Sequence, residues 1–161
     1  MDWLASQWRL ASLPPVARMP PIADPSPATL RFGWAARAAA AFCWAFAAFQ
    51  IAIALGAPFG ELTWGGSVAS PAAPMRAASA GAAVYLLLAG GAMLVRAGDW
   101  ARNAPRAPFR WFNALLAVQL ILNTLGNLAS RSLAERYGMG AATVAGAAFC
   151  ALALVESRQA P

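Results

Sequence analysis

Four long apolar segments, each without a charged residue, alternate with more polar stretches along the chain. They span residues 38–56, 77–95, 111–129 and 138–155. A helix needs about 17–25 apolar residues to cross the hydrocarbon core of a bilayer, and all four segments reach that length. None shows the period-two alternation of a membrane β-strand. Because backbone polar groups in lipid must be paired within their own segment, the pattern predicts an all-α integral membrane four-helix bundle.

The stretches that flank these segments set the predicted domain organisation. Residues 1–31 hold six prolines between Pro14 and Pro27. They are predicted to form a disordered cytoplasmic tail, with a short interfacial helix around Trp3 and Trp8 as the alternative. They lack the basic start and apolar core of a signal peptide. Residues 32–156 are predicted to form one transmembrane domain, followed by a short cytoplasmic tail over 157–161.

Composition strengthens the membrane prediction. Of 161 residues, 60% are hydrophobic and 11% are charged, against roughly 25% charged residues in soluble domains. The mean hydropathy is +0.54. These values argue against a soluble globular enzyme, which needs a charged surface, and against a disordered chain, which needs low hydrophobicity.

The residue types that are missing narrow the chemistry. The chain has no His, and all twelve basic residues are Arg. Ser-His-Asp and Cys-His catalysis cannot be built from it, and the commonest metal ligand is absent. Cys43 and Cys150 lie within apolar segments and form no CxxC pair, so we expect them to be packing residues. The sequence therefore predicts a protein without metal or cofactor and without enzymatic activity.

The arginines predict an orientation. Nine lie before the first segment, between the second and third, or after the fourth, and three lie in the other two connections. The positive-inside rule places both termini and the second connection in the cytoplasm of a cell membrane, with the first and third connections outward. The net charge of +6 is better explained by anionic lipid headgroups than by nucleic acid, because the arginines flank apolar segments.

Small residues predict where helices approach closely, because helices in lipid associate through backbone proximity and interhelical hydrogen bonds. Such residues recur along one predicted face of the second segment and one of the fourth. These are Ala77, Gly81 and Ala89, with Tyr85 among them, and Ala142, Gly146 and Cys150.

A stripe of amides is the most informative pattern. Gln119, Asn123 and Asn127 recur every four residues of the third segment. A step of four turns a helix by only about 40°, so the three share one face, which we expect to point into the bundle. Gln50 of the first segment and Asn123 both lie about 9 Å below the outward end of their helices. The alternatives are interhelical hydrogen bonds, worth about 0.6 kcal/mol each, or a polar pocket that opens outward.

The outward connections add candidates above this stripe. The first reads GAPFGELTWGG and holds Glu61 and Trp64; the third is the eight-residue SRSLAERY and holds Glu135 and Arg136. We expect these charges to be solvated, with an ion pair from Glu61 to an arginine of the third connection as the alternative. The candidate binding residues are Gln50, Glu61, Trp64, Gln119, Asn123, Asn127, Glu135 and Arg136.

The order GAPFGELTWGG, an arginine before the second segment, and NTLGNLASRSLAER closing the third resembles a group of small bacterial four-helix membrane proteins without assigned function. The resemblance covers residues 50–136 and implies no reaction. Any site shared with that group would involve Glu61, Trp64, Gly65, Gly66, Asn123, Asn127, Ser130, Ser132, Glu135 and Arg136.

Three functions fit these features. The first is a non-enzymatic bundle that binds a lipid, a lipophilic small molecule or a membrane partner, including a second copy, through its outward half. The second is a transporter or a transporter subunit, which the absence of carboxylates from the four segments disfavours. The third is an interfacial enzyme acting on lipid through Glu61 and Glu135, which the absence of His and Lys disfavours.

Overall fold

The computed structural model describes residues 33–63, 65 and 70–156. The chain divides into two compact units, residues 1–30 and 31–161, and every described residue belongs to the second. The tail predicted over residues 1–31, Trp64 and Gly66 of the first outward connection, and the tail predicted over residues 157–161 all lie outside the described residues.

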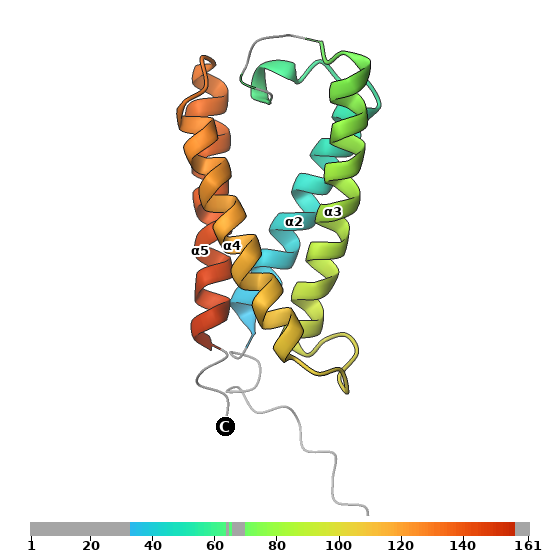
Figure 1. Ribbon diagram of the computed structural model, residues 1–161, viewed down its shortest axis with the longest axis vertical. Helices are drawn as coiled ribbons and strands as arrows, with labels where there is room; N and C mark the ends of the chain where they lie inside the picture. The colour runs from blue at the N-terminus through green and yellow to red at the C-terminus, as the bar shows by residue number, and fades with distance from the viewer. Residues whose placement is uncertain (1–32, 64, 66–69, 157–161) are drawn as a thin grey trace, which may run out of the picture. The chain divides into compact units, whose positions relative to one another are not determined.

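Four long helices make up the described part of the chain, which contains no strand (Figure 1). They are α2 (Trp34–Ala54), α3 (Ala73–Ala97), α4 (Ala107–Leu128) and α5 (Gly140–Glu156). A single 3-10 turn, η2 (Gly60–Leu62), lies between α2 and α3, and a π-helical turn, η4 (Ala134–Met139), leads directly into α5. The prediction of an all-helical chain with four helices long and apolar enough to cross a membrane is confirmed.

Helix boundaries follow local signals that hydropathy does not report. Pro74 and Pro108 stand in the first turns of α3 and α4, where a missing N–H removes no helical hydrogen bond. Helix α3 ends at Gly98, whose φ of 83° is left-handed, a conformation that glycine adopts without strain. Helices α2, α3 and α4 each begin four residues before the predicted apolar segment, whereas α5 begins two residues after it, preceded by η4.

The third connection is shorter than predicted. We expected a loop over residues 130–137, but helical structure resumes at Ala134. The Ser132 hydroxyl oxygen accepts a hydrogen bond from the backbone N–H of Glu135 (3.3 Å), as a helix-capping serine does. The prediction that Glu135 is a solvated loop charge is therefore wrong: it lies in η4 and is buried, at 5% exposure.

The helices are arranged as two hairpins. Helix α2 packs along α3 and α4 along α5, whereas the contacts between α3 and α4 are few. The hairpins meet at the end where α3 connects to α4, here called the loop end, and diverge toward the end that carries η2 and η4, here called the η end (Figure 1). The main hydrophobic cluster belongs to the part where they meet: Ala39, Ala40, Cys43, Ala89, Met93, Leu116, Ala117, Leu120 and Cys150.

Specific contacts join the helices toward the loop end. The Trp44 indole N–H donates to the carbonyl of Leu87 (3.3 Å), which ties α2 to α3. The Asn113 amide donates to the carbonyl of Cys150 (3.2 Å), which ties α4 to α5. Arg96 of α3 donates to the carbonyl of Ala153 in α5. Cys43 and Cys150 are free and buried in the core, as expected of packing residues.

The predicted close approaches hold only in part. Gly146 and Cys150 of α5 and Ala89 of α3 are buried, as a packing face requires. Ala77 and Gly81 of α3 are exposed, so the prediction is wrong for them. The reason is the rotation of α3: in this half of the helix the buried positions are Ser79 and Ala83, two residues along from the predicted ones.

Candidate functional site

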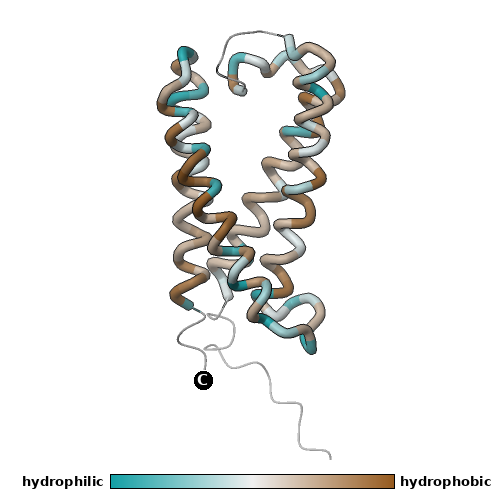
Figure 2. The backbone as a smooth tube through the Cα atoms, viewed as in Figure 1, coloured by the Kyte–Doolittle hydropathy of each residue, from teal (hydrophilic) through white to brown (hydrophobic). Residues whose placement is uncertain are grey.

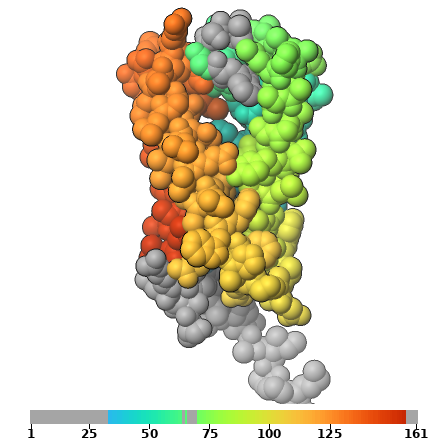
Figure 3. Space-filling view, in the orientation of Figure 1, coloured from blue at the N-terminus to red at the C-terminus, as the bar shows by residue number. Residues whose placement is uncertain are grey.

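A pocket of about 240 Å³ lies between the two hairpins, on the η side of the core. Its walls come from all four long helices and from both short turns. In the space-filling view the surface is hollowed here between α3 and α4 (Figure 3). The lining residues are Phe42, Phe46, Gln50, Leu62, Thr63, Ala82, Tyr85, Leu86, Leu116, Gln119, Leu120, Asn123, Asn127, Glu135, Met139 and Thr143.

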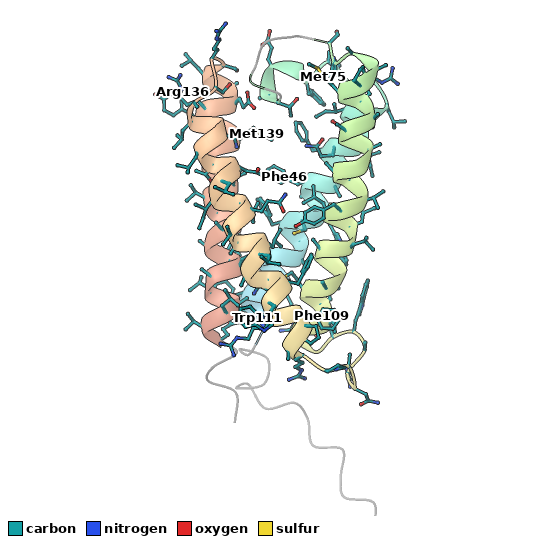
Figure 4. The ribbon with its side chains drawn as sticks, in the orientation of Figure 1. Phe46, Met75, Phe109, Trp111, Arg136 and Met139 are labelled. Atoms are coloured by element: carbon teal, nitrogen blue, oxygen red, sulfur yellow. The ribbon has the colours of Figure 1, made fainter. Side chains whose placement is uncertain are left out.

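The lining combines apolar and polar side chains along most of its depth. Figure 2 shows that polar positions interrupt the apolar surfaces of the helices at this level. Phe46 of α2 and Met139 of η4 both lie in the space between the hairpins (Figure 4). Along α4 the lining runs from Leu116 to Asn127, a distance of about 16 Å at 1.5 Å per residue. The pocket is therefore elongated along the helix axes.

A hydrogen bond joins α3 to α4 in the wall of the pocket. The Tyr85 hydroxyl donates to the Gln119 side-chain carbonyl at 2.7 Å. The Tyr85 ring also lies near that of Phe112, tilted by 54°, with ring centroids 6.3 Å apart. Because α3 and α4 share few other contacts, this bond joins the hairpins where they begin to diverge.

One wall is held together by hydroxyl groups between α4 and α5. The Thr143 hydroxyl lies 2.8 Å from that of Thr124, and it accepts a hydrogen bond from the Asn127 amide at 3.4 Å. It also donates to the backbone carbonyl of Met139 in η4 or of Gly140 in α5. The single hydroxyl proton of Thr143 is therefore used within the chain.

Two amides of the lining keep unused capacity. The side-chain carbonyl oxygen of Gln50 is buried and has no hydrogen-bond partner. Asn123 makes no side-chain hydrogen bond to any part of the chain that the structure describes. The stripe thus divides: Gln119 and Asn127 join helices, while Asn123 and the facing Gln50 present amides to the pocket. Gln119 and Asn123 are exposed residues and Asn127 is half-buried, so the stripe lines the pocket without being buried in the bundle as expected. Only the Gln50 oxygen is a buried acceptor without a partner, which is destabilising by about 1–3 kcal/mol.

Glu135 stands at the η end of the pocket. Its carboxylate accepts hydrogen bonds from the Ser130 hydroxyl (2.5 Å) and from the backbone N–H of Gly65 (3.3 Å). The second bond joins the segment after η2 to η4, so a residue between α2 and α3 contacts the second hairpin. Arg136 is turned elsewhere, because its guanidinium donates to the carbonyl of Ser130 (2.7 Å) and does not line the pocket (Figure 4).

The remaining candidates do not join this group. Glu61 is exposed in η2 and is absent from the lining. The ion pair weighed between Glu61 and Arg131 or Arg136 does not form: among residues 33–63, 65 and 70–156, the only ion pair joins Arg37 to Asp99. Trp64 lies outside the described residues. The outward connections are linked through Glu135 and Gly65 instead.

Several residues of the site were not singled out in the sequence. Tyr85 stood among small residues and was interpreted as part of a packing face. Thr143 follows the GMGAA stretch and carried no visible pattern. Asn113 is a further amide of the third apolar segment, but it is fully buried on the core side of the pocket, where it joins α4 to α5.

Comparison with protein-family models, with curated proteins and with solved structures finds no match to this chain. Among the described residues, no group of three or more Cys, Asp or Glu side chains could hold a metal ion. Function is therefore inferred from the geometry of the chain itself.

Proposed function

We propose that this chain is an integral membrane protein with four transmembrane helices, and that it binds a lipophilic molecule with a polar head group, without enzymatic activity, through the pocket at its η end. The observation that carries the proposal is the buried, unpartnered Gln50 carbonyl in a pocket that it shares with the amide stripe of α4 and with apolar side chains. In a bilayer no bulk water compensates such a group, so a bound polar head would stabilise it.

The surface of the helices supports membrane residence. Each of the four long helical spans is apolar enough to cross a bilayer. Large apolar side chains are exposed along the lengths of α3, α4 and α5, as lipid contact requires. Examples are Val84, Leu88, Leu115, Val118, Ile121, Leu122, Leu125, Val144 and Leu152.

The charges support an orientation in a cell membrane. Arg102, Arg106 and Arg110 lie at the loop end, where we place the cytoplasm together with both termini. The η end then faces outward. The pocket lies in the outer half of the membrane and reaches the lipid through the hollow between α3 and α4 (Figure 3).

The size of the pocket indicates what part of a ligand it holds. Pockets for drug-sized molecules are about 300–1,000 Å³, and this one, at about 240 Å³, is smaller. It suits a head group with a few methylenes rather than a whole lipid. The remaining chain would pass between α3 and α4 into the bilayer.

Binding of radiolabelled dodecanol to the purified protein in lipid nanodiscs tests this proposal. We expect saturable binding above that of empty nanodiscs. Ala82→Phe should remove it, because the ring would occupy the pocket. Asn123→Leu should weaken it roughly three- to tenfold, as expected for one lost hydrogen bond.

The matched control is Val84→Phe, which adds the same ring two residues away on the exposed face of α3. It should bind dodecanol as the wild type does. Equal loss in both phenylalanine variants, or no binding beyond that of empty nanodiscs, would show that the pocket is not a ligand site.

A further inference from the structure

The pocket leaves both donors and acceptors without a partner, but the amide N–H donors of Gln119 and Asn123 belong to exposed residues. The Tyr85 hydroxyl donates to the Gln119 side-chain carbonyl, and the Asn127 amide donates to the Thr143 hydroxyl. The buried atom of the lining that lacks a partner is an acceptor, the carbonyl oxygen of Gln50. A ligand that donates hydrogen bonds would satisfy it, whereas an anionic head group would not.

Glu135 adds further hydrogen-bond acceptors to the pocket, together with a negative charge. A carboxylate offers about four acceptor positions, and the structure fills two of them, from Ser130 and Gly65. Its bond to Gly65 is long, at 3.3 Å, and therefore weak. The side chain is almost fully buried within the chain and lines the pocket.

Among the residues that the structure describes, none of those lining the pocket is positively charged. The nearest arginine in sequence, Arg136, donates to the Ser130 carbonyl instead of to Glu135. Two aromatic rings, those of Phe42 and Phe46, also line the pocket, with their centroids 4.5 Å apart. Aromatic faces attract cations through the ring quadrupole.

We propose that the pocket selects amphiphiles whose head group is a cation with N–H donors, such as a protonated primary amine on an alkyl chain. The ammonium group binds Glu135 and the Gln50 carbonyl, and the chain leaves between α3 and α4. This inference rests on the proposed function, because it specifies the ligand of the same pocket.

Competition between three probes of equal chain length tests the head-group preference on the unmodified protein in nanodiscs. These probes are dodecylamine, dodecanol and dodecanoate at neutral pH. We expect dodecylamine to bind at least about tenfold more tightly than dodecanol, because a charge-assisted hydrogen bond replaces a neutral one. Dodecanoate should bind most weakly. A short soluble amine, ethylamine, should compete poorly, because it has no chain to place in lipid.

Variants assign the preference to one side chain. Glu135→Gln keeps the size and one carbonyl acceptor of the residue but removes the charge. It should bring the ratio of the dodecylamine affinity to the dodecanol affinity close to one, and this ratio is the quantity compared with that of the wild type. Glu61→Gln is the matched control, since Glu61 is an exposed carboxylate at the same end of the bundle, and it should retain the full preference.

The outcomes separate this inference from the proposal beneath it. Equal binding of dodecylamine and dodecanol by the wild type would overturn the cation preference and leave the pocket as a site for neutral amphiphiles. A preference that survives Glu135→Gln, or is lost in Glu61→Gln, would overturn the role of Glu135. Strong binding of ethylamine would overturn the preference for amphiphiles and indicate a site for soluble amines.

If no probe binds saturably, the proposed function fails as well. The probe comparison needs no variant, so it stays decisive if Glu135→Gln does not fold.

Discussion

The two ends of the helix bundle use small residues in opposite ways. Toward the loop end, glycines receive aromatic rings: a Cβ on Gly90 would lie 2.3 Å from the Trp44 indole nitrogen, and one on Gly146 would lie 2.5 Å from the Phe42 ring. Toward the η end, Gly81, Gly126 and Gly138 have no neighbour within 4 Å of such an atom. One end is packed through its glycines, whereas at the other end these three glycines are exposed and do not line the pocket.

This contrast shows that a small residue in an apolar helix does not identify a contact by itself. Gly81 and Gly90 belong to the same helix, α3, yet Gly81 is exposed and Gly90 is buried. What differs is the partner: α2 brings the Trp44 ring to the position of Gly90. In lipid, where helices associate through close packing rather than hydrophobicity, stability should therefore depend mainly on the loop end.

The largest predicted effect tests the packed end. Gly90→Ala should lower the free energy of unfolding by about 1–3 kcal/mol, because the Trp44 ring must move and its packing is lost. Unfolding in mixed micelles with increasing dodecyl sulfate measures this change. Gly126→Ala, in open space at the other end, should be neutral or slightly stabilising. Comparable losses at both glycines would contradict the difference between the two ends.

An intermediate effect tests the boundary between the ends. Tyr85→Phe removes the hydroxyl that donates to Gln119. The free energy of unfolding should fall by about 0.6 kcal/mol, the average for interhelical hydrogen bonds in membranes. The control is Tyr137→Phe, in the exposed part of η4, which should leave unfolding unchanged. A larger effect of Tyr137→Phe would show that Tyr85 and Gln119 do not hold α3 against α4.

The smallest predicted effect lies at the loop end, outside the packed helices. Asp99 accepts two hydrogen bonds from Arg37, both at 2.8 Å, and these hold the pKa of its carboxyl below the ordinary value. Since the folded pKa is lowered, the pair stabilises the protein above the unfolded Asp pKa of about 3.9. This contribution is lost as the pH falls through the lower folded pKa.

Asp99→Asn should therefore lower the melting temperature slightly at neutral pH, by an amount equivalent to about 0.2–0.5 kcal/mol, because the pair is exposed. The difference from the wild type should shrink toward zero in acid and also in high salt. A difference that grows as the pH falls would show that the ion pair is not its source.

The helices could be predicted from the sequence because lipid imposes a length and an absence of charge that hydropathy detects directly. The ends of the helices could not be predicted in the same way, because they depend on capping residues and on paired charges. Helix α2 begins at Trp34 and includes Arg37, which an uncharged segment excludes by definition. Arg37 is tolerated because Asp99 pairs with it.

The pocket could be predicted only where its residues share one helix. The four-residue spacing of Gln119, Asn123 and Asn127 implies one face, and all three line the pocket. The burial of Glu135 could not be predicted, since it depends on the turn that Ser130 and Ser132 form around it. Tyr85 is identified only once the rotation of α3 against α4 is known.

The hydrogen bond between Gly65 and Glu135 gives the site a built-in reporter. The carboxylate oxygen that accepts the Gly65 N–H is part of the same group that we propose to bind an ammonium ion. An ammonium ion bound to the same carboxylate draws electron density from that oxygen, so filling the pocket weakens the hydrogen bond of the Gly65 N–H. The rate at which the Gly65 amide exchanges with deuterium would then rise with occupancy of the pocket. A molecule that enters through the lipid would therefore change the hydrogen bonding of a residue in the outward connection.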